Sequence, residues 1–218
     1  MLPLQDIRVL DFSTLLPGPL ASLILAEAGA EVIKVERPGV GEDMRGYPPD
    51  LGGRSGSFAL LNRGKRAIAL DLRAPGAAQS LLALAPTIDI VLEQFRPGVM
   101  DRLGLGYAAW REANPGILYC AITGYGQDGP RAREAGHDMN YQAATGILAL
   151  TAGSDGAPGV PPTLVGDIAG GTYPAVVNLL LALRRRDRTG EGCFIDIAMA
   201  ENLFTFQFLG LATGQGAG

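Results

Sequence analysis

The strongest constraint on the fold is the alternation of short β-branched runs with helical patterns along the chain. Strands are predicted at Ile7–Phe12, Val32–Val35, Ala67–Leu70, Ile88–Leu92, Ile117–Ile122 and Phe194–Ile197. Helices are predicted at Leu20–Ala28, Gly76–Leu84, Tyr107–Ala113, Met139–Leu148, Ile168–Leu183 and Ala198–Leu209. This alternation favours an α/β fold with a mostly parallel, doubly wound sheet flanked by helices. Ligands bind such sheets beyond the carboxyl ends of the strands.

The composition indicates a globular chain and excludes several classes of function. Of 218 residues, 47% are hydrophobic and 18% charged, and the net charge of −4 disfavours a nucleic-acid partner. Two cysteines and one histidine exclude a Cys/His zinc cluster or a disulfide framework, so no metal site is expected. No signal-peptide pattern opens the chain. The longest aliphatic run has about ten residues where a membrane span needs about twenty, so we expect a cytoplasmic protein without a membrane span.

A glycine motif follows the fifth predicted strand. Residues 124–129 match the G-x-G-x-x-G pattern of dinucleotide-binding folds. That site needs a helix to begin at the third glycine, so that N–H groups at the start of the helix face a pyrophosphate. Here Pro130 and two arginines follow, without an apolar helical pattern. The motif therefore favours a glycine-rich loop over a dinucleotide site.

Basic side chains gather near the ends of predicted strands. All but two of the 18 basic residues are arginines. Arg37 follows the second strand, Lys65 precedes the third, and Arg96 and Arg102 follow the fourth. Arginine binds phosphate through its planar guanidinium fork, so one interpretation is a phosphate-binding cradle on an otherwise acidic protein. The other interpretation, ordinary solvated charges, is equally open at this point.

The single histidine belongs to a second group of candidate residues. His137 stands where a short polar stretch opens a helix, and Tyr141, four residues on, falls on the same helix face. Asp167 precedes a long apolar stretch and is predicted to be the N-cap of the helix there. One interpretation makes both His137 and Asp167 ordinary helix caps. The other makes them two proton-transferring groups at neighbouring helix starts.

Many of these segments occur in the order typical of one family. They are Val-Leu-Asp-Phe-Ser, Gly-Ala-Glu-Val-Ile-Lys-Val-Glu-Arg-Pro-Gly, Asn-Arg-Gly-Lys-Arg, Phe-Arg-Pro-Gly-Val-Met-Asp-Arg, Gly-Tyr-Gly-Gln-Asp-Gly-Pro, Gly-His-Asp-Met-Asn-Tyr, Gly-Asp-Ile-Ala-Gly-Gly and Ile-Asp-Ile-Ala-Met-Ala-Glu. With these motifs the chain resembles the family III CoA-transferase (CaiB/BaiF) superfamily, and within it the α-methylacyl-CoA racemase branch. The resemblance covers essentially the whole chain.

The resemblance implies a Rossmann-like large domain that binds acyl-CoA as its substrate, with no tightly bound cofactor, and an interlocked homodimer. Family members are longer, so residues 1–218 would be the N-terminal portion of that domain, without the family's small domain and C-terminal return segment. The resemblance places five residues along the CoA path: Arg37, Lys65, Phe95, Arg96 and Arg102. This agrees with the phosphate-cradle interpretation.

The same resemblance implies the catalytic roles. His137 and Asp167 would be the acid/base pair of a racemase, which inverts the carbon α to a CoA thioester through an enolate, and Tyr141 would position the substrate. Backbone N–H groups at the start of the Asp167 helix are candidate oxyanion donors. The transferase branch instead uses the aspartate as a nucleophile and generally lacks the histidine, so His137 favours the racemase. A third possibility is a truncated, non-catalytic CoA-binding module.

Overall fold

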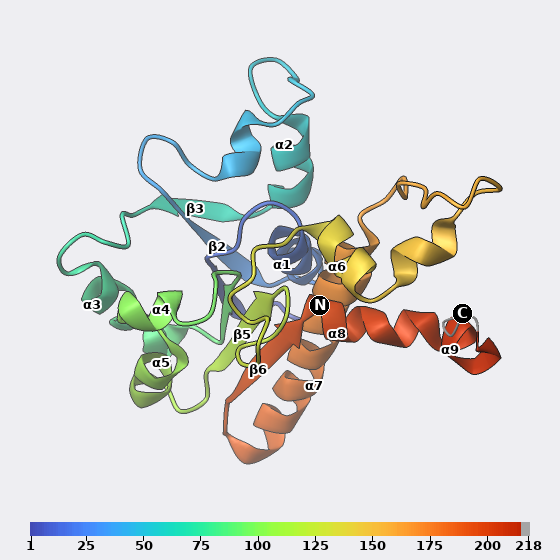
Figure 1. The fold of residues 1–218 in the computed structure, drawn as a ribbon. Helices are drawn as coiled ribbons and strands as arrows, with labels where there is room; N and C mark the ends of the chain where they lie inside the picture. The colour runs from blue at the N-terminus through green and yellow to red at the C-terminus, as the bar shows by residue number, and fades with distance from the viewer. Residues whose placement is uncertain (215–218) are drawn as a thin grey trace.

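The computed structural model describes residues 1–214, which form a parallel sheet with helices on both faces (Figure 1). The strands are β1 (Arg8–Asp11), β2 (Glu31–Glu36), β3 (Arg66–Ala69), β4 (Ile90–Glu93), β5 (Leu118–Thr123) and β6 (Cys193–Ala198). Their spatial order, β3-β2-β1-β4-β5-β6, is that of a Rossmann fold, and every neighbouring pair is parallel. The predicted fold class and the six predicted strands are confirmed.

Two apolar cores lie on the two faces of the sheet. Helices α1 (Pro17–Glu27) and α7 (Tyr173–Thr189) cover one face, while α3 (Ala77–Leu82), α4 (Val99–Arg102) and α5 (Tyr107–Ala113) cover the other. Side chains alternate along each strand, so that Val9 packs in the first core and Leu10 in the second. Because both faces are covered, the central strands β1 and β4 are apolar on both faces rather than alternately polar, and their carboxylates, Asp11 and Glu93, lie at the carboxyl ends.

Several shorter elements differ from the expected ones. Helix α6 (Asp138–Ala144) ends before the expected Leu148, and Gly146, at a φ of 82°, separates it from the 3₁₀ turn η3 (Ile147–Thr151). The last expected helix divides into α8 (Met199–Phe204), η5 (Thr205–Gln207) and α9 (Phe208–Thr213). Hydrophobic periodicity did not indicate four other elements: η1 (Asp43–Gly46), α2 (Gly56–Asn62), η2 (Ala85–Thr87) and α4. Each of these four is seven residues or shorter, which leaves little room for a period to appear.

The long apolar helix begins as a π-helix, labelled η4 (Gly166–Thr172), which continues into α7. Asp167 therefore lies inside the first helical turn, and the prediction that it is the N-cap is wrong, since the flanking position belongs to Val165. Gly170 allows this wide turn to approach α8, because a Cβ there would lie 2.5 Å from the carbonyl oxygen of Met199. A π-helical turn is rare and is frequent at functional sites.

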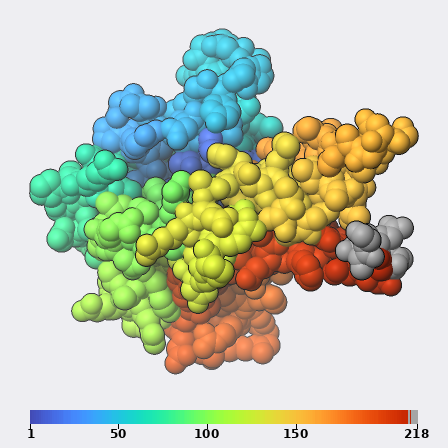
Figure 2. All heavy atoms as spheres, in the orientation of Figure 1, coloured from blue at the N-terminus to red at the C-terminus, as the bar shows by residue number. Residues whose placement is uncertain are grey.

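The segments around η3 and α9 project from the rest of the molecule (Figure 2). Phe204, Phe206 and Phe208 are more than half exposed there. Separately, the helical stretch Gly166–Thr189 is long and apolar enough to cross a membrane by length and composition alone, but 44% of its most apolar window is buried. Core helices of soluble proteins pass the same test, so this is weak evidence, and the cytoplasmic location stays a prediction.

Candidate active site

Two cavities lie beyond the carboxyl ends of the strands. The smaller, of about 270 Å³, lies at the ends of β4 and β5 and includes part of the loop after β1. The larger, of about 510 Å³, lies at the ends of β2 and β3. Phe95, which follows β4, lines both cavities, so the two adjoin. They flank the neighbouring strands β1 and β4, where the strand order reverses and α/β sheets bind their ligands.

The smaller cavity brings together five of the residues singled out from the sequence. His137 and Tyr141 come from α6, Asp167 from η4, and Phe95 and Arg96 from the loop after β4. These segments are distant in the chain and meet because β4 and β5 are neighbours in the sheet. The site is therefore assembled by the topology and not by any one motif.

His137 is the N-cap residue of α6, as the sequence indicates. Its backbone N–H donates to Oδ1 of Asn140 at 2.9 Å, which fixes the start of the helix. The side chain is exposed and lines the smaller cavity. The ring also takes part in a capping box, in which the His137 side chain faces the backbone of Asn140 while the Asn140 side chain bonds the backbone N–H of His137.

Asp167 has an unusual environment for a carboxylate. Its own side chain accepts no hydrogen bond within the described part of the chain, while its backbone N–H donates to Oδ1 of Asp138 at 2.9 Å. Burial, followed by the nearby Asp138 carboxylate, raises the pKa of Asp167 to about 7. The protonated and ionised forms are therefore both populated near neutral pH, which suits a group that must both give and take a proton.

The backbone donors beside Asp167 are already engaged. The N–H of Asp167 is bonded to Asp138, and the N–H of Ile168 donates to the carbonyl of Leu164 at 3.0 Å. Asp138 is itself buried and receives a second hydrogen bond from Nε2 of Gln142 at 2.5 Å. These two N–H groups therefore do not serve as the free oxyanion donors expected at this helix start.

Tyr141 forms a wall of the smaller cavity. Its hydroxyl donates to the carbonyl of Gly136 at 2.6 Å, and burial raises the pKa of the phenol to about 12. The ring lies so close to two loops that a Cβ on Gly124 or Gly136 would come within 2.6 or 2.7 Å of it. Gly124 thus packs against the ring from a loop, and no helix begins between Gly124 and Asp138, which confirms the loop interpretation of the G-x-G-x-x-G motif.

The remaining basic candidates lie in different places. Arg37 lines the larger cavity and forms an exposed ion pair with Asp43. Lys65 is buried and donates to the carbonyl of Pro19 and to Oδ1 of Asn62, both at 2.8 Å. Arg102 is exposed on α4 and lines neither cavity. The three basic groups therefore do not line one common cavity.

Comparison with known sequences decides the family. The sequence model of CoA-transferase family III matches residues 4–214. The chain belongs to CoA-transferase family III. It is 41% identical to the mouse succinyl-CoA:glutarate CoA-transferase over 90% of this chain and 45% of that protein. It is 39% identical to the human alpha-methylacyl-CoA racemase over 91% of this chain and 48% of that protein.

Solved structures agree with this family. A CAIB/BAIF family protein from Brucella suis superposes with a TM-score of 0.90 at 36% identity, covering 97% of this chain and 58% of that one. The family III chain described here spans about half the length of the relatives that it matches in sequence.

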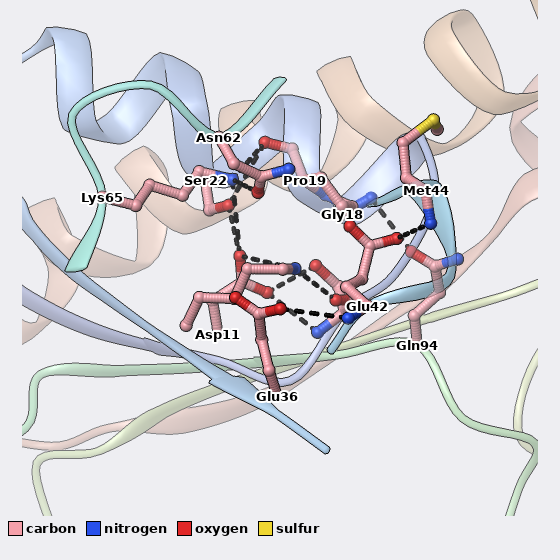
Figure 3. A network of polar contacts seen from close by, with 12 residues as sticks. Asp11, Gly18, Pro19, Ser22, Glu36, Glu42, Met44, Asn62, Lys65 and Gln94 are labelled. Atoms are coloured by element: carbon pink, nitrogen blue, oxygen red, sulfur yellow. Dashed lines mark hydrogen bonds and ion pairs between the residues drawn. The ribbon is translucent and has the colours of Figure 1, made fainter. Parts of the chain in front are cut away.

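A buried charge network lies beside the family III cavities (Figure 3). Oδ2 of Asp11 lies 3.6 Å from Nζ of Lys65 and 3.9 Å from Nζ of Lys34 and accepts the hydroxyl of Ser22 at 2.6 Å. Burial alone would raise the pKa of Asp11, but the two lysines and the serine hydroxyls lower it below its usual value. Burial lowers the pKa of Lys65 to about 8. The sequence shows these residues but not that they meet.

Other lining residues of the site were not singled out from the sequence. The smaller cavity also contains Leu15, Pro17, Gln94, Glu134 and Met199. They come from loops and helix starts, where no hydrophobic period distinguishes them, although Met199 stands in the segment Ile-Asp-Ile-Ala-Met-Ala-Glu. Asp138 could have been noticed as an acidic residue beside His137, but its contact with Asp167 depends on the packing of α6 against η4.

Proposed function

We propose that this family III chain carries the acid/base pair of an acyl-CoA racemase, His137 and Asp167. The observation that supports it is that both side chains line one cavity at the switch point of the sheet, where the Asp167 carboxylate accepts no hydrogen bond within the described residues. The similarity to the human alpha-methylacyl-CoA racemase is compatible with this pair. Tyr141, which walls the same cavity, would hold the substrate through its ring because its hydroxyl is already bonded.

The proposed reaction moves protons and leaves the oxidation state unchanged. Neutral His137 takes the proton from the carbon α to the thioester, and the C–H electron pair becomes the π bond of an enolate. Protonated Asp167 then delivers its proton to the opposite face of that carbon, and the enolate collapses to the thioester. The other enantiomer uses the two groups in reversed roles. Each positioned group contributes on the order of 10²–10⁴-fold to such a step.

The two adjoining cavities suggest a path for the CoA part of the substrate. The nucleotide would lie in the larger cavity, whose apolar residues include Val35, Leu70 and Leu72, with Arg37 at its rim. The pantetheine arm would pass Phe95 and Arg96 toward His137 and Asp167 in the smaller cavity. Contact of CoA with Lys65 and Arg102, closure of the site by a second domain and assembly as an interlocked homodimer stay predictions.

The second candidate function is that of a CoA-transferase. The chain is 39% identical to the acetyl-CoA:oxalate CoA-transferase of Acetobacter aceti over 94% of this chain and 52% of that protein, so this function is equally worth testing. The ionised carboxylate of Asp167 would attack the thioester carbonyl, the C–S bond would break, and CoA would leave as its thiolate. An aspartyl anhydride results, from which the acyl carboxylate is released when CoA thiolate returns to the aspartyl carbonyl. The unpaired carboxylate of Asp167 suits this attack as well.

The deciding experiment is proton exchange in deuterated water. The full protein is mixed with a single enantiomer of a 2-methylacyl-CoA, and deuterium uptake at the α-carbon is followed by mass spectrometry. Uptake together with loss of optical activity supports the racemase, and their absence in a folded sample that binds CoA contradicts it. Trapping of an acyl-aspartate by hydroxylamine, with full activity of His137→Ala, would support the transferase. Binding of CoA without either reaction would indicate a binding module.

A further inference from the structure

The loop between β1 and α1 forms part of the wall of both cavities. Thr14 lines the larger cavity, whereas Leu15 and Pro17 line the smaller one. Among residues 1–214, Leu15 is the one non-glycine residue with a positive φ, at 61°. A residue with a Cβ is sterically disfavoured in this left-handed conformation, so surrounding contacts must hold it there.

Glu42 makes the contact that holds Leu15. Its Oε1 accepts the backbone N–H of Leu15 at 2.7 Å. The same oxygen accepts the backbone N–H of Met44 at 3.1 Å (Figure 3). The residue is 4% exposed, so little water competes for these bonds. Its Oε2 is buried and has no hydrogen-bond partner within the described residues. Glu42 comes from the segment after β2, and its bond therefore joins the ends of two neighbouring strands.

Glu42 is itself fixed from the side opposite to the loop. Its backbone N–H donates to Oε2 of Glu36 at 3.0 Å, and the Glu36 carboxylate is held by two hydrogen bonds from Arg45, at 2.6 and 2.7 Å. Two further contacts hold the ends of the loop. Nζ of Lys34 donates to the carbonyl of Ser13 at 2.6 Å, and Gly18 donates to Oε1 of Gln94 at 3.0 Å.

We propose that Glu42 is a positioning residue for the acyl-CoA site, which acts through the backbone of Leu15 to fix the wall between the two cavities. The kinetic part of this inference rests on the proposed function. On the proposed path the nucleotide would contact the larger cavity, whereas the thioester would depend on the wall beside His137 and Asp167. Since misplacement by about 1 Å can cost 10²-fold in rate, loss of the bond should lower kcat more than it changes KM.

Two conservative variants separate the hydrogen bond from the charge. Glu42→Gln keeps the length and a carbonyl acceptor for Leu15, and its new amide group replaces an oxygen that accepts nothing. Glu42→Asp keeps the charge but is one methylene shorter, so it cannot span the same distance to the N–H of Leu15. A double variant, Glu42→Asp with Leu15→Asn, supplies a residue that adopts a positive φ more easily than leucine does.

The full protein is used for two measurements: hydrogen exchange of the Leu15 amide, and kcat and KM for α-proton exchange of a 2-methylacyl-CoA. We expect Glu42→Asp to speed amide exchange at least tenfold and to lower kcat about 10- to 100-fold, with KM within about threefold. Glu42→Gln should stay within about threefold of the parent in both amide exchange and kcat. Adding Leu15→Asn to Glu42→Asp should recover at least half of the loss in kcat, measured on a logarithmic scale.

Several outcomes would overturn the inference. A slowly exchanging Leu15 amide in Glu42→Asp, or a Glu42→Gln that is the worse of the two, would show that the bond to Leu15 is not what matters. A fast amide with unchanged kcat would show that the loop is not needed for the reaction. If the parent protein exchanges no α-proton, the proposed function fails. The inference is then decided by exchange of the Leu15 amide, which should be at least tenfold faster in Glu42→Asp but not in Glu42→Gln.

Discussion

Asp11 and Asp167 are two carboxylates at the same edge of the sheet whose pKa values are shifted in opposite directions. Removal from water raises the pKa of both. At Asp11 two lysines and two serine hydroxyls reverse the effect, and the pKa is lowered. At Asp167 the nearest charged group is another carboxylate, Asp138, and the pKa rises to about 7. The charged neighbours, and not burial, separate a carboxylate that stabilises the fold from one that can exchange a proton.

The lysines of the chain lie beside the structural carboxylate, Asp11, and not beside Asp167. The chain has two lysines, Lys34 and Lys65, and both are buried against Asp11. The remaining basic residues are arginines, of which Arg96 reaches the smaller cavity. A compact ammonium fits a closed pocket of oxygen atoms, whereas a guanidinium offers the fork that phosphates and carboxylates bind.

The largest expected effect comes from removing the side chains that are proposed to exchange protons. Asp167→Asn and His137→Ala should each lower α-proton exchange by about 10²–10⁴-fold, because in the proposed reaction each group serves one face of the α-carbon. Circular dichroism should show an unchanged fold. Asp155→Asn, in an exposed loop outside both cavities, is the matched control and should retain the parent rate. Full exchange in Asp167→Asn would remove Asp167 from the reaction.

The next effect concerns the structural carboxylate. Asp11→Asn should lower the free energy of unfolding by about 3 kcal/mol at pH 7, because it leaves Lys34 and Lys65 buried without an anion. Urea unfolding measures this. Since the pKa of Asp11 is lowered in the folded state, its contribution is present above the ordinary carboxyl pKa and disappears as the pH falls through the folded value. A loss below about 1 kcal/mol at pH 7 would show that the lysines find other partners.

Much of the fold was predictable because both faces of the sheet are covered. Covered parallel strands give continuous apolar runs, so strands such as Leu118–Thr123 stand out in the sequence. The π-helical start of η4 was not predictable, since it depends on the close contact between Gly170 and Met199 of α8. For that reason the prediction that Asp167 caps its helix was wrong, although the helix itself was expected.

The residues of the candidate site were more predictable from the sequence than the environment that surrounds them. His137, Tyr141 and Asp167 were identified in the sequence, and all three line the smaller cavity. The pKa of Asp167 could not be foreseen, because it depends on Asp138 reaching it across the contact of α6 with η4. Nor could the positive φ of Leu15, since leucine carries no signal for that conformation.

A smaller effect distinguishes Asp167 from Asp11 by the pH dependence of the free energy of unfolding. The pKa of Asp167 rises from an ordinary value near 3.8 to about 7 on folding, so its ionisation opposes folding as the pH rises between those values. Asp167→Asn removes this cost. We expect the variant to gain on the order of 1–2 kcal/mol over the parent above pH 7, after allowance for solvent screening, and nothing below pH 4. Urea unfolding at pH 4 and pH 8 checks this, and an equal gain at both would contradict the pKa assignment.

The smallest expected effect tests whether Lys65 stabilises the fold together with Asp11 or contacts CoA. The side chain of Arg37 is 63% exposed and lines the larger cavity, whereas that of Lys65 is 2% exposed and lies against Asp11. Arg37→Gln should weaken CoA binding about three- to tenfold at low salt, in line with a partly solvated phosphate contact. Lys65→Met should change that affinity less than about twofold and lower the free energy of unfolding instead. Titration calorimetry measures both variants. A larger loss of affinity in Lys65→Met would place its ammonium on the CoA path, as the family resemblance implies, and would require the Asp11 network to open when CoA binds.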